Sequence, residues 1–125
     1  MKSHYQIFHL VFLLAYLCCN FVLAQTNSRL AQQWFDTGRT EKDLNKKIEA
    51  FHKAVEADPK FVQALYYLGL TYKTRKDFVR AELFLSQAKD AGSSLRKPED
   101  KFAIYYELSK VHLRIGNAVR AEQLL

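Results

Sequence analysis

The sequence contains few of the residues that interrupt helices or build covalent and metal cross-links. Its 125 residues include four glycines, two prolines and two cysteines. Both cysteines, Cys18 and Cys19, lie near the N-terminus, so residues 25–125 contain none. That part of the chain can form neither a disulfide nor a thiolate metal site, and its stability has to come from packing.

Strand signals are lacking too, because no segment alternates apolar and polar residues over the length of a strand. After about Ser28 the chain consists of segments with helical periodicity. The two prolines, Pro59 and Pro98, stand where helices should begin or connect. The sequence therefore predicts an all-α fold.

Patterns that carry catalysis are also missing. Beyond residue 24 there are two histidines, His52 and His112, and no group of His, Cys, Asp or Glu has metal-ligand spacing. Glu99 and Asp100 are adjacent carboxylates, which suit the first turn of a helix better than an acid–base pair. There is no glycine-rich phosphate loop. We predict no enzyme activity, no metal site and no cofactor.

The N-terminal segment of the sequence is strongly apolar. Lys2 and the terminal amine give it a positive start, and residues 10–19 form an unbroken apolar run. Val22, Leu23 and Ala24 place modest or small residues at the positions that a signal peptidase recognises. We predict a signal peptide over residues 1–24, cleavage after Ala24, and export to a periplasm or to the extracellular space.

Two other functions for this segment stay open at the level of the sequence. Residues 7–24 are just long enough for an uncleaved membrane anchor, although His9 and Asn20 are costly in hydrocarbon. Cys18 and Cys19 lie near the place of a lipoprotein cysteine. The residues before them, at positions 15–17, do not follow the small-residue pattern of such signals.

Positive charge exceeds negative charge but is not concentrated. The net charge is +6, and loss of residues 1–24 leaves +5. The basic residues occur as pairs at positions 46–47, 75–76 and 96–97, with no run of five. This distribution favours weak attraction to acidic surfaces and argues against a dedicated nucleic-acid site.

The most informative stretch, residues 65–85, has the pattern Leu-x2-Leu-Gly-x2-Tyr followed by Ala-x3-Leu. A first helix would present Leu65, Leu68 and Tyr72 on one face. Gly69 would allow a second helix to approach closely, and Asp77 would cap that helix. The second helix would turn small or apolar residues inward at positions 81, 85 and 88. The pattern predicts an antiparallel helix pair.

The same pattern recurs on both sides, which indicates an internal repeat. Forty residues on, positions 105, 108 and 112 match the first helix, Gly116 the turn, Asn117 the cap, and positions 121 and 125 the second helix. The extra residues fall in 92–98, and Pro98 suits a helix start. Thirty-four residues earlier, Asp43 matches the cap, and Phe51 and Ala54 match inward positions. There Gly38 replaces the tyrosine, and Lys47 replaces the first alanine.

These spacings resemble the tetratricopeptide repeat (TPR) over roughly residues 28–125. The match comprises a degenerate repeat at 28–61, a repeat at 62–95 with an inserted loop to about 101, and a partial repeat at 102–125. Besides Gly38 and Lys47, three further positions depart from the pattern, with Ser93 for proline, Ser109 for glycine and His112 for tyrosine. The resemblance implies antiparallel helix pairs stacked as a right-handed solenoid with a concave groove, and a core position for His112.

In this family the first helix of each pair lines the groove. Carried over by position, the resemblance implies a partner-binding groove that includes Gln63, Tyr66, Leu70, Lys73, Tyr106, Lys110 and Arg114. Such a surface suits a protein or peptide partner with some acidic character. Alternatively, Tyr66 and Tyr106 stack on each other as packing. The carboxylate clamp of the family is not reproduced, because Gln32 and Asp36 stand where lysine and asparagine are wanted.

The function we predict is an exported protein–protein interaction scaffold without catalysis. The alternative is a periplasmic sensory TPR segment of a larger membrane-anchored signalling regulator, since no stop signal precedes Leu125 and we expect the chain to continue. An array that associates with its own copy is a third option. Membrane contact is expected only if the leader is kept or the chain continues.

Overall fold

The computed structural model describes residues 2–94 and 98–123, and all of its elements there are helices. They are α1 (Lys2–Thr40), α2 (Leu44–Ala57), α3 (Val62–Thr74), α4 (Phe78–Ala91), the short 3₁₀ helix η1 (Gly92–Ser94) and α5 (Pro98–Gln123). The described residues contain no strand. The predicted all-α class is confirmed.

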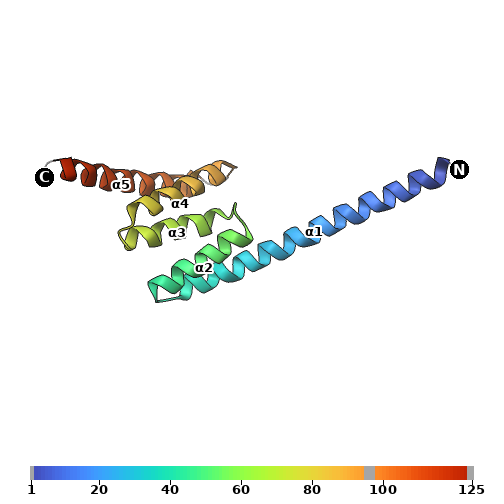
Figure 1. The fold of residues 1–125 in the computed structure, drawn as a ribbon, viewed down its shortest axis with the longest axis horizontal. Helices are drawn as coiled ribbons and strands as arrows, with labels where there is room; N and C mark the ends of the chain where they lie inside the picture. The colour runs from blue at the N-terminus through green and yellow to red at the C-terminus, as the bar shows by residue number, and fades with distance from the viewer. Residues whose placement is uncertain (1, 95–97, 124–125) are drawn as a thin grey trace.

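The first helix, α1, has two different halves. It continues without a break through the cleavage site predicted after Ala24, and its N-terminal half projects away from the other helices (Figure 1). The described side chains from Tyr5 to Leu30 are exposed, whereas Ala31 and Phe35 are buried beside α2. Among the described helices, none is both long enough and apolar enough to cross a membrane. The signal peptide stays a prediction.

Two helix pairs, α1–α2 and α3–α4, each contain one glycine in close contact with the partner helix. A Cβ atom added at Gly69 would lie 2.7 Å from Cγ of Leu85, so the predicted close approach of α4 is confirmed. A Cβ atom added at Gly38 would lie 2.6 Å from Cε1 of Phe51. In the first pair, therefore, a phenylalanine ring fills the space that a tyrosine at position 38 would need.

The predicted caps of α2 and α4 are present. Asp43 accepts a hydrogen bond from the Lys46 backbone N–H at 2.9 Å, and Asp77 accepts one from the Arg80 N–H at 3.1 Å. The turn before Asp77 places Lys76 at a φ of 65°, the left-handed region that lets a chain leave one helix and enter the next. These local signals set the two hairpin turns.

The core lies where α2, α3 and α4 meet. Its largest fully buried side chains include Phe51, Leu65, Leu68 and Leu85. Tyr72 stacks on Phe84 with ring centres 5.5 Å apart, and its hydroxyl lies 2.9 Å from Nε2 of His52. Tyr72 of α3 thus contacts both α2 and α4.

The turn predicted at Gly116, with a cap at Asn117 and a new helix through Ala121, is wrong for the described residues. The helix α5 is continuous from Pro98 to Gln123, and Leu125 lies outside the described residues. Glycine costs a helix interior only about 1 kcal/mol, and asparagine costs less, so neither residue enforces a break as proline would. A Cβ atom added at Gly116 would meet nothing within 4 Å, so none of the described helices packs against this position.

The inward face predicted for α5 is only partly right. Ile104, Leu108 and Val111 are buried, whereas Tyr105 is 57% exposed. His112, expected in a core position, is exposed and pairs with Glu82 of α4, Nε2 to Oε1, at 2.9 Å. The reason is that α4 packs against the side of α5 that carries Ile104, Leu108 and Val111, while His112 lies at the edge of this contact, where it reaches Glu82 but is not covered.

Candidate functional site

The predicted groove residues lie between α3 and α5, which run side by side in the same direction. The N-terminal turns of both helices line one cavity of about 250 Å³. The C-terminal turn of α3 and later residues of α5 line a second cavity of about 500 Å³. Between the two cavities, Lys73 of α3 is joined to Glu107 of α5 by an ion pair. We call this surface of α3 and α5 the candidate groove, with an apolar end at the first cavity, a charged middle at Lys73 and Glu107, and a basic end at the second cavity.

The apolar end is a small cavity with tyrosine on one wall. Its lining residues are Val62, Gln63, Tyr66, Tyr67, Asp100, Ala103 and Ile104. The rings of Tyr66 and Tyr67 meet edge to face, with centres 5.7 Å apart. Ile104 is 4% exposed and forms the floor, whereas Asp100 and Gln63 are exposed at the surface. Such a cavity is apolar inside and polar at its rim.

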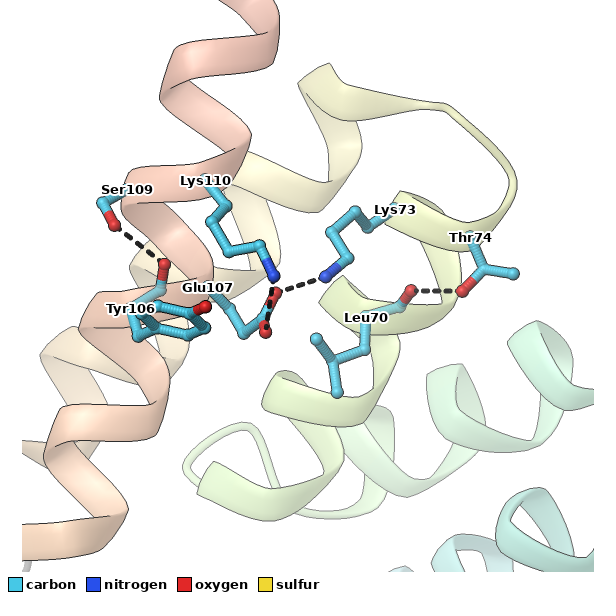
Figure 2. Close-up of polar contacts among 7 residues, drawn as sticks. All are labelled: Leu70, Lys73, Thr74, Tyr106, Glu107, Ser109 and Lys110. Carbon is cyan, nitrogen blue, oxygen red and sulfur yellow. Dashed lines mark hydrogen bonds and ion pairs between the residues drawn. The ribbon is translucent and has the colours of Figure 1, made fainter.

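The middle of the groove is organised by Glu107. Its side chain, 14% exposed, forms an ion pair with Lys73, and its Oε1 lies 3.8 Å from Nζ of Lys110 (Figure 2). Nζ of Lys110 also lies 4.8 Å from the ring centre of Tyr106. One carboxylate thus holds two ammonium groups, one from each wall of the groove.

Glu107 also acts on Tyr66. Burial raises the pKa of the Tyr66 hydroxyl above 10.0, and the nearby Glu107 carboxylate and Tyr67 raise it further. Each of these causes disfavours the phenolate form. At neutral pH the Tyr66 hydroxyl is therefore a proton donor beside the apolar cavity.

The basic end collects cations from both helices and from the α3–α4 turn. Its lining residues are Lys73, Thr74, Lys76, Phe78, Lys110 and Arg114, with no acid among them. The Thr74 hydroxyl donates to the Leu70 carbonyl at 3.0 Å, so it is engaged within α3 (Figure 2). No described acid forms an ion pair with Lys76 or Arg114. The charge of these two residues is free to attract an anion.

The structure brings most of the predicted residues together. Gln63 and Tyr66 lie at the apolar end, and Lys73, Lys110 and Arg114 lie at the basic end. Leu70 is half-buried on α3, between the two ends. Tyr106 lies at the edge, 50% exposed, and stacks on Phe102 with ring centres 6.0 Å apart. Tyr66 and Tyr106 thus have different aromatic partners, and the predicted alternative that they stack on each other is not observed.

Sequence reasoning missed Glu107. A signal for it exists, because Ala103, Glu107, Lys110 and Arg114 follow the three- and four-residue spacing of one helix face. The resemblance selected Tyr106 instead, one position away.

Other candidate chemistry is sparse in the described part of the chain. No three or more residues of the His, Cys, Asp and Glu types gather there as a metal site would require. His52 and His112 lie on different helices with different partners, Tyr72 and Glu82. No protein-family model matches this sequence, and no curated protein matches it either. The geometry of the groove is therefore the main evidence on function.

Proposed function

We propose that this protein is an exported, TPR-type helical scaffold that binds a polypeptide partner in the groove between α3 and α5. The repeat assignment is supported by the two helix pairs. Each begins its second helix with an aspartate cap, at Asp43 and Asp77, and these lie 34 residues apart. Phe51 and Leu85, which are also 34 residues apart, are fully buried in the second helix of each pair.

One observation carries the binding proposal. The same two helices, α3 and α5, line an apolar cavity beside Tyr66 and a second cavity with cations at Lys76 and Arg114 that pair with no described acid. At about 250 Å³, the cavity is smaller than the ~300–1,000 Å³ of most small-molecule sites. It suits one side chain of a longer ligand, and the groove beyond it suits the rest of a chain. Tyrosine and arginine are the residue types that most often supply binding energy at protein interfaces.

Export is proposed from the N-terminal segment, whose apolar run and Ala24 are typical of a leader. N-terminal sequencing of the protein recovered from producing cells tests this part, and the first residue should be Gln25. A first residue at position 1 would contradict it. The sensory alternative stays a prediction.

The binding proposal is tested by placing a photo-cross-linking phenylalanine analogue at Tyr106 or at Tyr105. These neighbours are 50% and 57% exposed, but Tyr106 borders the groove and Tyr105 faces a different side of α5, beside Lys89 and Lys101. Irradiation of producing cells should join a polypeptide to position 106 and not to position 105. Cross-linking at neither position, or at 105 alone, would contradict the proposed function.

A further inference from the structure

We infer that the groove recognises a two-part pattern in an extended peptide. One apolar side chain occupies the cavity beside Tyr66, an Asp or Glu about four residues away binds at Lys76 and Arg114, and the residues between them are not acidic. This inference rests on the proposed function and adds the chemistry of the ligand. It follows from the sizes, charges and spacing of the three parts of the groove.

The first part of the pattern comes from the apolar end. Val62, Ala103 and Ile104 surround the cavity together with the ring of Tyr66. Burying one large apolar side chain is worth about 1.5–3 kcal/mol, and anchors of this kind dominate peptide binding. Asp100 at the rim disfavours a second acidic residue there. The cavity therefore selects an uncharged apolar residue.

The second part comes from the unequal pairing of the cations. Glu107 already pairs with Lys73 and lies near Lys110, so these two ammonium groups are partly neutralised. Lys76 and Arg114 line the same cavity and form no ion pair with a described acid. An incoming carboxylate gains most beside those two residues, because an unpaired cation attracts it without having to break an existing pair.

The distance between the two subsites follows from the length of α3. Tyr66 and Thr74, which line the two cavities, are eight residues apart, or about 12 Å along a helix at 1.5 Å per residue. An extended peptide covers that distance in about four residues at about 3.3 Å each. The apolar and acidic residues of the ligand are thus four positions apart, in either chain direction.

The middle of the pattern is set by Glu107. Its carboxylate lies between Lys73 of α3 and Lys110 of α5 (Figure 2), so a peptide that spans the two cavities would pass beside it. Because Glu107 already engages Lys73 and Lys110, a peptide carboxylate there gains less from these two ammonium groups than at the basic end, and Glu107 repels it at short range. Glu107 accordingly excludes acids from the middle positions and favours hydrogen-bond donors such as Ser, Asn or Gln.

The experiment is selection of a random ten-residue phage-displayed library on the full chain. Enriched peptides should share one apolar and one acidic residue four positions apart, with no acid between them. Binders without this pattern would overturn the inference and leave the proposed function standing. A library that yields no binder would contradict the proposed function, and the inference with it.

Variants then test each subsite with an enriched peptide, measured by fluorescence anisotropy. Ala103→Leu fills the apolar cavity and should weaken binding about tenfold, as loss of one buried anchor does. Ser109→Leu adds the same residue on the exposed side of α5 and should change the affinity less than about twofold. Circular dichroism confirms that both variants fold. Equal affinities of the two variants would overturn the apolar subsite.

The acidic subsite is tested by Lys76→Asn with Arg114→Gln, where asparagine tolerates the positive φ of position 76. We expect a loss of about tenfold for this pair. The control, Lys46→Gln with Lys60→Gln, removes the same charge at exposed positions outside the groove and should have little effect. Equal losses would show long-range attraction only, and would overturn the subsite. Glu107→Gln should admit acids at the middle positions in a repeated selection.

Discussion

The helices α3 and α5 carry similar apolar patterns but differ in how many of their sides are covered. Forty residues separate matching positions, and Ala64, Leu68 and Thr71 correspond to Ile104, Leu108 and Val111, all of them buried. On the next side, Leu65, Gly69 and Tyr72 are buried against α4. Their counterparts at positions 105, 109 and 112 are exposed.

The comparison shows that a partner helix, as well as the apolar pattern, decides which side of a helix becomes core. The second helix of the pair covers α3, while α5 continues straight through Gly116. The candidate groove lies between the two helices. Lys73 therefore projects from α3, which is covered on two sides, and its partner Glu107 projects from α5, which is covered on one side. Substitutions at matched positions of α3 and α5 test this difference between the two helices.

The largest effect is expected at Tyr72 and His112, which share one register. Tyr72→Ala removes a 5% exposed ring and its contacts with His52 and Phe84, and should lower the free energy of unfolding by about 3 kcal/mol. His112→Ala removes one exposed ion pair and should cost less than about 1 kcal/mol. Urea denaturation followed by circular dichroism measures both. A larger loss for His112→Ala would mean that its side of α5 is covered.

A smaller effect is expected from adding a side chain at Gly69. Gly69→Leu would collide with Cγ and the backbone nitrogen of Leu85, and should cost about 2 kcal/mol through overpacking. Ser109→Leu, at the matching position of α5, should change the unfolding free energy by less than about 0.5 kcal/mol. The same urea curves test this pair, and equal costs would contradict the open side of α5.

A gain in stability of up to about 1 kcal/mol is expected for Gly116→Ala. Position 116 lies inside α5, where alanine is the better helix former. The matching residue in the turn between α3 and α4, Lys76, has a φ of 65°. If Gly116 adopted such a turn, alanine would destabilise the chain instead. The sign of the change in unfolding free energy therefore distinguishes a continuous α5 from a hairpin.

The smallest effect concerns the pH dependence of the core around Tyr72. Burial lowers the pKa of His52 below 6.5, and Arg80 lowers it further, while Glu56 opposes the shift. Because the folded-state pKa lies below the unfolded value, this stabilising contribution is present above pH 6.5 and is lost as pH falls through the folded-state pKa. The urea midpoint should fall between pH 7.5 and pH 5. His52→Gln should reduce that fall, and an unchanged fall would contradict the assignment to His52.

The sequence predicted the helix class and the two hairpins because their signals are local. Capping by Asp43 and Asp77 and close contact at Gly69 depend on residues within one helix pair. At Gly38, the resemblance indicated a missing tyrosine but not its cause. The structure gives the cause, because the ring of Phe51 lies where a side chain at position 38 would be.

For the candidate groove, the sequence predicted basic and tyrosine side chains but not the ion pair between its two helices. Position matching identified Lys73 and Lys110, but it did not identify the carboxylate that lies between them. Pairing of Lys73 with Glu107 depends on how α3 and α5 are placed across the groove, which no local pattern specifies. The turn at Gly116 was wrong because a glycine permits a break without requiring one.

The most direct test of the groove as the binding surface is an NMR titration of the chain with ¹³C-labelled tyrosine rings. The seven tyrosines include Tyr66 and Tyr67 at the apolar cavity, Tyr106 at the groove edge and Tyr105 on a different side of α5. Addition of the most enriched peptide should shift the ring signals of Tyr66, Tyr67 and Tyr106 and leave Tyr105 in place. A shift of the Tyr105 signal with the Tyr66 signal unchanged would contradict binding of the peptide in the groove.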